Sequence, residues 1–272
     1  MTVISSPNNT RIKQIRALRN RKAREQTSTF FIEGIQSVTE AVQLCAEIET
    51  LIVAPDLLTS EQARALVATQ QRAGTPLLEV TAAVFESLSA KDVAPGLAAV
   101  VRQRWAVLAA LQPRATDCWV ALDAVQYPGN LGTILRTSDA AGGAGVLLLG
   151  NTADPYDSTC VRASVGAIFS QQLVRTNTAA FAAWARQYDL AIVGASPAAA
   201  TDYRDVEYRR PLVLLMGGER NGLSAAEQAL CDAVVRIPMV GRRDSLNLAV
   251  ATSLMLYEVL RQRQPQSRAC SA

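Results

Sequence analysis

Residues 214–224 of the chain read LLMGGERNGLS. The apolar run that ends at Met216 is typical of a buried strand, and the glycines after it indicate a loop whose backbone can approach a ligand closely. Ser224 then stands where a following helix would be capped. The loop matches neither GxxxxGK[ST] nor GxGxxG, which disfavours a nucleoside triphosphate or a dinucleotide as the ligand.

A second segment of the same kind precedes it in the chain. Residues 123–136 read DAVQYPGNLGTILR and follow another apolar run. Asn130 is predicted to cap a helix, and Arg136 lies about one and two-thirds turns further along that helix. An ordinary surface arginine would also fit this position, although the residues around it are mostly small or apolar.

A third segment follows the first two. Residues 237–251 read IPMVGRRDSLNLAVA, and a helix is predicted to start in it at Ser245 or Asn247. Helix capping alone explains a serine and an asparagine here about as often as a function does. The order and spacing of the three segments together form the specific signal.

The three segments belong to a longer alternation of predicted strands and helices. Continuous apolar runs are typical of parallel strands covered on both faces, whose ligands lie at the carboxyl ends of the strands. The predicted strands are 118–122, 146–149, 191–193, 212–216 and 234–237. The predicted helices are 131–141, 159–168, 178–187, 224–230 and 246–263. We therefore expect a domain over residues 118–265 built on a mostly parallel sheet.

The first hundred residues predict a separate, smaller domain. Short apolar segments near 30–32, 51–53, 77–80 and 97–101 alternate with helical patterns. This alternation indicates a small α/β domain over residues 1–101. Residues 102–117, which contain Gln112-Pro113-Arg114, are predicted to connect it to the second domain.

Positive charge is concentrated at the amino-terminal end. The whole chain has a net charge of +3, whereas residues 1–29 hold seven basic residues and one acid, a net of +6. The basic residues are Arg11, Lys13, Arg16, Arg19, Arg21, Lys22 and Arg24. An arginine-rich helix on an otherwise acidic chain predicts contact with nucleic-acid phosphates. From charge alone, a solvated helix face is an equally good interpretation.

The composition excludes several kinds of chemistry. The chain has no histidine, which rules out Ser-His-Asp hydrolysis, Cys-His nucleophile pairs and histidine-ligated zinc. Its five cysteines are dispersed without a CxxC pair, so we expect reduced, mostly buried thiols and no metal site. No apolar run is long enough for a membrane span, and the first residues do not read as a secretory signal. We expect a cytoplasmic protein.

In order and spacing, the motifs NLGTILR, MGGERNG and IPM…SLNLAVA resemble those of the SpoU family of S-adenosylmethionine-dependent RNA ribose 2'-O-methyltransferases, in the SPOUT superfamily. The resemblance covers roughly Trp119 to Arg263. The segments SPNNTRIKQIRALRNRKAR and FFIEG are similar to the ribosomal-protein-like substrate-binding domain that many members carry.

The resemblance implies a fold, a cofactor and a set of site residues. It implies an N-terminal RNA-binding domain, and a catalytic α/β domain whose carboxyl-terminal chain passes through a trefoil knot. A second subunit of a homodimer would complete the site. By motif position, the implied active-site residues are Asn130, Arg136, Glu219, Ser245 and Asn247. The implied contacts with S-adenosylmethionine are Gly217, Gly218, Ile237, Met239 and Leu246.

The resemblance also implies a reaction, in which a ribose 2'-hydroxyl attacks the sulfonium methyl group. A guanidinium holds its proton at neutral pH, so we expect Arg136 to orient phosphate and stabilise the attacking oxygen more readily than to act as a base. We expect Asn130 and Glu219 to hold Arg136 and the loop in register, and Ser245 and Asn247 to fix the knot and the nucleotide. Ribosomal RNA is the favoured substrate by analogy, with transfer RNA as the alternative. A non-catalytic RNA-binding protein and a Rossmann-type oxidoreductase are the competing hypotheses.

Overall fold

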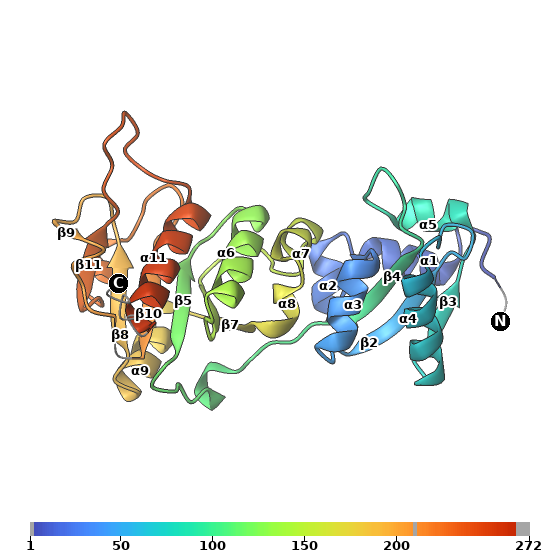
Figure 1. The fold of residues 1–272 in the computed structure, drawn as a ribbon, viewed down its shortest axis with the longest axis horizontal. Helices are drawn as coiled ribbons and strands as arrows, with labels where there is room; N and C mark the ends of the chain where they lie inside the picture. Colours follow the sequence, from blue (N-terminus) through green and yellow to red (C-terminus); the bar gives the residue numbers. More distant parts are fainter. Residues whose placement is uncertain (1–2, 209–210, 265–272) are drawn as a thin grey trace, which may run out of the picture. The chain divides into compact units, whose positions relative to one another are not determined.

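The computed structural model describes residues 3–208 and 211–264, which form two compact units (Figure 1). Unit 1 contains the described residues up to Arg104 together with Asp154–Ser170. Unit 2 contains Trp105–Ala153 and the described residues from Gln171 onward. The sequence-based boundary placed residues 154–170 in the second domain, whereas in the structure they pack with the amino-terminal residues.

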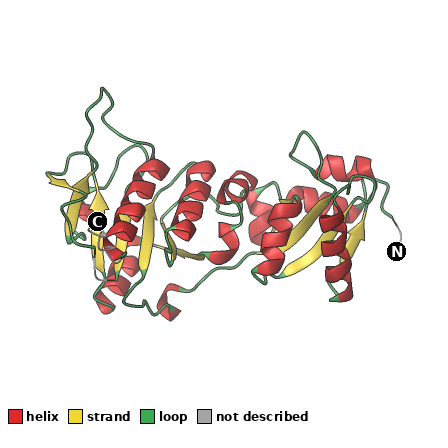
Figure 2. Cartoon of the chain, viewed as in Figure 1, coloured by secondary structure: helices red, strands yellow, loops and turns green. Residues whose placement is uncertain are grey.

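Unit 1 is built on a mixed four-stranded sheet (Figure 2). Its strands are β1 (Thr29–Glu33), β2 (Ile48–Val53), β3 (Leu77–Glu79) and β4 (Leu97–Arg102). They lie in the order β1-β4-β2-β3, and only β2 and β3 run parallel. The helices are α1 (Thr10–Ala17), α2 (Arg21–Thr27), α3 (Ile35–Gln43), α4 (Glu61–Arg72), α5 (Ala82–Leu88), α7 (Ser158–Ser164) and α8 (Ala167–Ser170).

The predicted basic helix is divided in two. Asn9 caps α1 by accepting a hydrogen bond from the backbone N–H of Arg11. The first helix ends at Ala17, and α2 begins at Arg21. Ile12 and Leu18 face the core of unit 1, where they join apolar residues of α5 and of the sheet. The apolar side chains of this segment therefore lie inward.

Unit 2 is built on a parallel sheet, as predicted. Its strands are β5 (Cys118–Asp123), β6 (Gly145–Leu149), β7 (Gln172–Thr176), β8 (Ala191–Ala195), β9 (Thr201–Asp202), β10 (Leu212–Met216) and β11 (Ala233–Arg236). In the described part of the chain they are ordered β7-β6-β5-β10-β8-β11-β9 with every pair parallel. All their carboxyl ends therefore lie at one edge, which includes the loops after β5, β10 and β11.

Helices cover the sheet of unit 2. They are α6 (Pro128–Ala140), α9 (Thr178–Gln187), α10 (Ala225–Gln228) and α11 (Leu248–Arg263), with a 3-10 turn η1 (Leu108–Ala110). Trp119 and Ala121 of β5 pack on one face with Phe181 and Trp184 of α9. The chain returns from β11 to place α11 against α6 and β10 (Figure 1). The last helix of unit 2 therefore lies beside its first helix and beside an interior strand of the sheet.

Several predicted elements differ in detail. Strands β7 and β9 were not predicted, and the predicted helix 159–168 is divided into α7 and α8. The prediction that Asn130 caps the helix is wrong. The helix α6 begins at Pro128, two residues before Asn130, and Tyr127 occupies the cap position. Proline fits the first turn of a helix, where its missing N–H would have no partner. Among the described residues, no helix has both the length and the apolar character needed to cross a membrane.

Candidate active site

A carboxylate joins two loops at the carboxyl edge of the parallel sheet. Glu219 follows β10 and accepts two hydrogen bonds, one from the backbone N–H of Gln126 at 2.8 Å and one from Asn130 Nδ2 at 2.6 Å. Gln126 lies in the loop after β5, and Asn130 lies in the first turn of α6. Because Asn130 is inside the helix instead of capping it, its side chain is available for this contact.

The third loop is joined to the same group. Asn247 Nδ2 donates to Asn130 Oδ1 at 3.1 Å. Its own Oδ1 caps α11 by accepting from the backbone N–H of Ala249 at 2.9 Å and of Val250 at 3.4 Å. Of the two predicted starts, Ser245 and Asn247, the structure has Asn247 as the cap of α11. Glu219, Asn130 and Asn247 thus form one network built from the three segments that the sequence singles out.

The direction of this network is fixed at both ends. An ionised carboxylate only accepts hydrogen bonds, and the backbone N–H groups at the start of α11 only donate. Asn130 must therefore turn its amide nitrogen toward Glu219, and Asn247 must turn its oxygen toward α11. Neither amide can be reversed without leaving two like groups face to face.

The loop after β10 is closed on itself. Gly218 and Gly222 pair as an isolated bridge, and the Gly222 N–H donates to the Gly218 carbonyl at 2.9 Å. A Cβ on Gly217 would lie 2.1 Å from the Gly222 carbonyl carbon, so the backbone passes itself more closely than any side chain allows. Ser224 caps α10, as predicted, in a reciprocal capping box with Glu227. Glu219 therefore lies on a short loop that is closed by its own backbone.

Arg136 lies apart from this network. It is exposed on α6, and none of the described residues forms a hydrogen bond or an ion pair with it. Six helical residues separate it from Asn130, which turns the two side chains about 120° apart around the helix axis. Asn130 and Glu219 therefore hold the loop, as expected, but within a single chain they do not hold Arg136.

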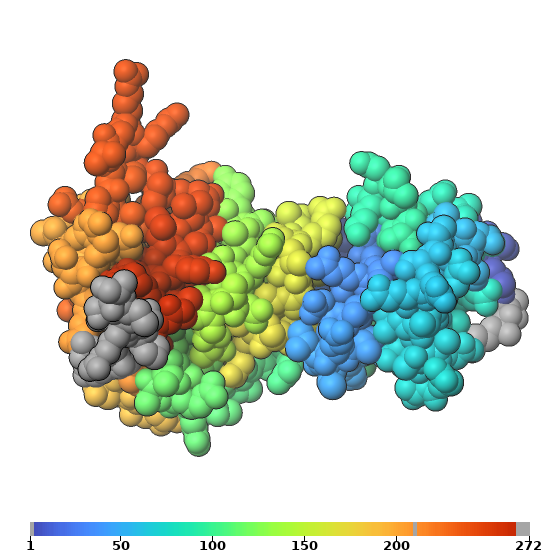
Figure 3. Space-filling model, in the orientation of Figure 1, coloured from blue at the N-terminus to red at the C-terminus, as the bar shows by residue number. Residues whose placement is uncertain are grey.

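The loop between β11 and α11 carries the other predicted residues. In Figure 3 this orange-red loop stands out from unit 2. Ile237 and Met239 are half-buried, whereas Ser245 and Leu246 are exposed. The hydroxyl of Ser245 reaches only the neighbouring Asp244, at 3.4 Å. The structure thus joins Asn247 to the network and leaves Ser245 outside it.

The sequence analysis did not single out two further residues near this network, Gln126 and Asp123. Gln126 acts on Glu219 through its backbone N–H, which every residue except proline possesses, while its side chain donates to the carbonyl of Asn151 at 3.1 Å. Asp123, at the end of β5, has its carboxyl pKa raised by burial and then by the nearby Glu227. Only the tertiary structure brings the Gln126 N–H to Glu219.

The predicted RNA-contacting residues divide into three sets. Arg11, Lys13 and Lys22 are exposed. Arg16, Arg19 and Arg21 are in use within unit 1: Arg16 and Arg19 donate to the end of α5, and Arg21 pairs with Glu25. Arg24 is only 2% exposed and pairs with Asp154, so it is removed from the predicted RNA surface.

The cysteines mostly follow the prediction. Cys118 and Cys160 are buried free thiols, and Cys231 is half-buried. Burial raises the pKa of Cys118 to about 12. Cys45 is exposed, contrary to the prediction, because the chain turns out of α3 there with a φ of 53°. Cys270 lies outside the described residues.

Comparison with known proteins agrees with this geometry. Residues 117–257 match the SpoU rRNA Methylase family, and residues 9–99 match the MRM3-like substrate binding domain. A 23S rRNA (uridine(2479)-2'-O)-methyltransferase of Streptomyces viridochromogenes is 34% identical over 265 residues, covering 94% of this chain and 91% of that protein. The 23S rRNA (guanosine(2553)-2'-O)-methyltransferase RlmP of Bacillus subtilis is 27% identical, covering 95% and 99%.

A solved structure is similar over almost the whole chain. The AdoMet-bound rRNA methyltransferase from Sinorhizobium meliloti superimposes with a TM-score of 0.90 and 37% identity, covering 97% of this chain and 99% of that one.

Proposed function

The chain belongs to the SpoU rRNA methylase family, and we propose that it transfers a methyl group from S-adenosylmethionine to a ribose 2'-hydroxyl of ribosomal RNA, in the cytoplasm. The observation that carries the proposal is the Glu219–Asn130–Asn247 network, which binds the three motif loops into one site. A protein that only bound RNA would not need this network at the carboxyl edge of a sheet.

The residues at this edge suit the cofactor. The loop after β10 brings backbone groups together where a Cβ on Gly217 would not fit, as expected for a ligand held by the main chain. Partly exposed apolar side chains at Ile237, Met239 and Leu246 suit the flat face of an adenine. We place Gly217, Gly218, Ile237, Met239 and Leu246 as the residues that hold S-adenosylmethionine, which supplies a methyl group on a positively charged sulfur.

The remaining site residues position the RNA and stabilise charge. Glu219, Asn130 and Asn247 keep the three loops in fixed register, which holds the reacting atoms at attacking distance. As the 2'-oxygen takes the methyl group, the methyl–sulfur bond would break to leave a neutral thioether, and the hydroxyl proton would pass to the nucleotide phosphate or to water. Arg136 binds that phosphate and stabilises the negative charge that develops on the 2'-oxygen. A guanidinium is suited to both tasks because its planar donors match a phosphate. Ser245 contacts the nucleotide from the exposed loop.

A second copy of the chain completes the site in this proposal. Val250, Leu254 and Tyr257 are 48%, 38% and 50% exposed, and their i, i+4, i+7 spacing gives α11 an uncovered apolar face. Thr137, next to Arg136 on α6, hydrogen-bonds Ser253 of α11, so Arg136 belongs to the same part of the surface. A homodimer formed on this face would bring Arg136 to the site of the other subunit.

Oligomeric state tests this part of the proposal. Leu254→Arg should convert a dimer into a monomer in light scattering and abolish methyl transfer, whereas Val93→Arg, at an 83% exposed position in unit 1, should do neither. A parent protein that is monomeric at micromolar concentration and still active would exclude the dimer.

Methyl transfer itself is tested with radiolabelled S-adenosylmethionine. Purified protein is incubated separately with deproteinised ribosomal RNA, with transfer RNA and with ribosomal subunits, and labelled nucleosides are identified after digestion. We expect 2'-O-methylated nucleosides from ribosomal RNA. Label only in transfer RNA would correct the substrate, label on a base would refute the reaction, and binding without label would indicate a non-catalytic RNA-binding protein.

A further inference from the structure

Residues 154–170 complete the core of unit 1, although they lie between β6 and β7 in the sequence. The ring of Phe30 on β1 lies 4.6 Å from that of Tyr156 and 6.1 Å from that of Phe169, centre to centre. The Tyr156 hydroxyl accepts from the backbone N–H of Arg104 at 2.8 Å and donates to its carbonyl at 2.7 Å. This segment is therefore held by specific contacts with the amino-terminal residues.

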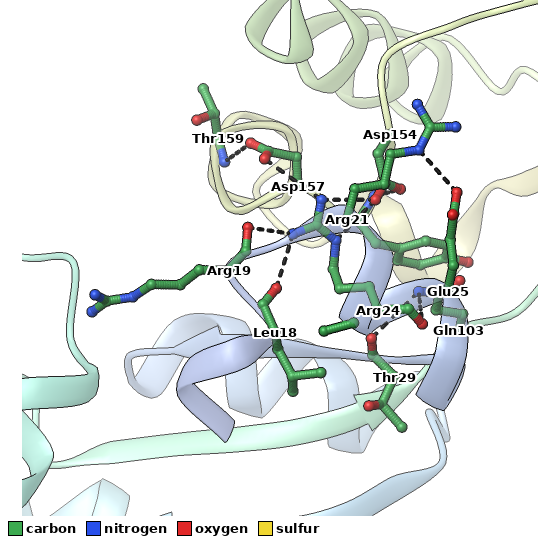
Figure 4. A network of polar contacts seen from close by, with 12 residues as sticks. Leu18, Arg19, Arg21, Arg24, Glu25, Thr29, Gln103, Asp154, Asp157 and Thr159 are labelled. Carbon is green, nitrogen blue, oxygen red and sulfur yellow. Dashed lines mark hydrogen bonds and ion pairs between the residues drawn. The ribbon is translucent and has the colours of Figure 1, made fainter. Parts of the chain in front are cut away.

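A buried arginine fixes the start of the segment (Figure 4). Arg24 Nε and Nη2 both reach Asp154 Oδ2 at 2.8 Å, and Nη2 lies 3.7 Å from Asp157 Oδ2. Nη1 donates to the carbonyls of Leu18 and Arg19, each at 2.9 Å. All three guanidinium nitrogens are thus in use, and a lysine could not reproduce this with its single nitrogen.

The two carboxylates in turn order the backbone that follows them. Asp154 Oδ1 accepts from the Tyr156 N–H at 3.0 Å, and Asp157 Oδ1 caps α7 by accepting from the Thr159 N–H at 2.8 Å. Each carboxylate therefore uses one oxygen for Arg24 and the other for the main chain. Arg24 places one positive charge beside both carboxylates, and Arg24 and Asp154 are both shielded from water there.

One peptide bond connects this arrangement to the residues around the proposed site. Asp154 follows Ala153, whose N–H donates to the Val125 carbonyl at 2.7 Å. The next residue, Gln126, donates its N–H to Glu219 and its side-chain amide to the Asn151 carbonyl. The stretch 151–154 is thus anchored at one end to Glu219 through Gln126 and at the other end to Arg24.

We propose that Arg24 is a positioning residue for methyl transfer, which holds Asp154 in place and thereby keeps the Gln126–Glu219 pair in register. The proposal rests on the function proposed above. The backbone bridge between Gly218 and Gly222 closes the cofactor loop without Gln126, so loss of Arg24 should spare cofactor binding. It should lower the rate of the chemical step, since a misplacement of about 1 Å costs up to about 100-fold.

The test compares Arg24→Lys and Arg24→Met with the control Arg64→Met. Arg64 also lies in unit 1, where it donates to the carbonyls of Leu58 and Thr59; among the described residues it forms no hydrogen bond or ion pair with residues 154–170. We expect kcat to fall about tenfold in Arg24→Lys and further in Arg24→Met, as for displaced reacting groups. The dissociation constant for S-adenosylmethionine should change less than twofold, and Arg64→Met should retain the parent kcat.

Two further measurements separate positioning from loss of folded protein. Asp157→Asn keeps a side chain that can cap α7 but removes the negative charge that faces Arg24. This variant should fold more readily than Arg24→Met, and its kcat should be severalfold lower than that of the parent. The double variant Arg24→Lys, Glu219→Gln should be no slower than Glu219→Gln alone, because both substitutions act through the Gln126–Glu219 pair. If Arg24 had a purely structural role, the two reductions in kcat would multiply. Parent kcat in folded Arg24→Lys, or multiplicative effects, would overturn the proposal. A parent chain without methyl transfer would overturn the proposed function instead.

Discussion

Glu219→Gln removes one acceptor from the centre of the site while changing almost no volume. The parent carboxylate accepts at both oxygens, from the Gln126 N–H and from Asn130 Nδ2. A glutamine offers one oxygen and one NH₂ group, so one of these two donors must face another donor. Asn130 cannot compensate by reversing its amide, because Asn247 would then have to reverse as well and release the cap of α11.

The size of the effect follows from the lost hydrogen bond. A hydrogen bond to a charged group contributes roughly 1.5–3 kcal/mol. At about 1.4 kcal/mol per factor of ten, this corresponds to roughly 10- to 150-fold in kcat/KM if the network must be intact during methyl transfer. Glu219 is half-buried, so water can take over part of the lost contact, and we expect a value near the lower end.

A second substitution should restore the activity. In the double variant Glu219→Gln, Asn130→Asp, the new amide donates to the new carboxylate, and its oxygen accepts from the Gln126 N–H. The other oxygen of that carboxylate accepts from Asn247, so every hydrogen bond of the parent network has a counterpart. The assay is methyl transfer to ribosomal RNA at saturating S-adenosylmethionine, with the exposed Glu61→Gln as control. A folded single variant within twofold of the parent, or a double variant no faster than the single one, would refute this account.

Three other predictions concern stability and reactivity. Asn247→Ala should lower the free energy of unfolding by about 1 kcal/mol through loss of the cap of α11, measured by urea denaturation, and a value near zero would contradict the cap. In peptide mapping after alkylation at pH 8, Cys45 should react first and Cys118 should stay unmodified until the protein unfolds, because burial raises the pKa of Cys118 to about 12; early labelling of Cys118 would contradict this. The hydrogen bond from Arg261 lowers the pKa of Glu258, so this carboxylate should stabilise the fold above its unfolded pKa, and stability should be lost as the pH falls through the folded value. In Glu258→Gln, the free energy of unfolding, measured by urea denaturation at a series of pH values, should fall less steeply at acid pH than in the parent. An equally steep fall would show that Glu258 does not contribute to this loss of stability.

Local signals in the sequence were sufficient for most of the architecture. Apolar runs marked the strands that became β5, β6, β8, β10 and β11, because a strand covered on both faces must be apolar throughout. The requirement that parallel strands end at one edge then indicated that the three motif loops would meet there. The cap at Asn247 and the capping box at Ser224 could also be predicted, since they involve only neighbouring residues.

The tertiary structure decided what depends on distant partners. Strand β7 carries polar residues, and it becomes a strand through its pairing with β6. Arg24 lies in a basic segment of the kind that binds RNA, yet its side chain is buried. It pairs with Asp154 and Asp157, which are 130 residues or more away in the chain. The sequence determined by itself which loops meet at this edge, because the edge at which a strand ends depends on local pattern and on parallel pairing. Which arginine faces the solvent and which one is enclosed depends on long-range packing, and no local spacing encodes it.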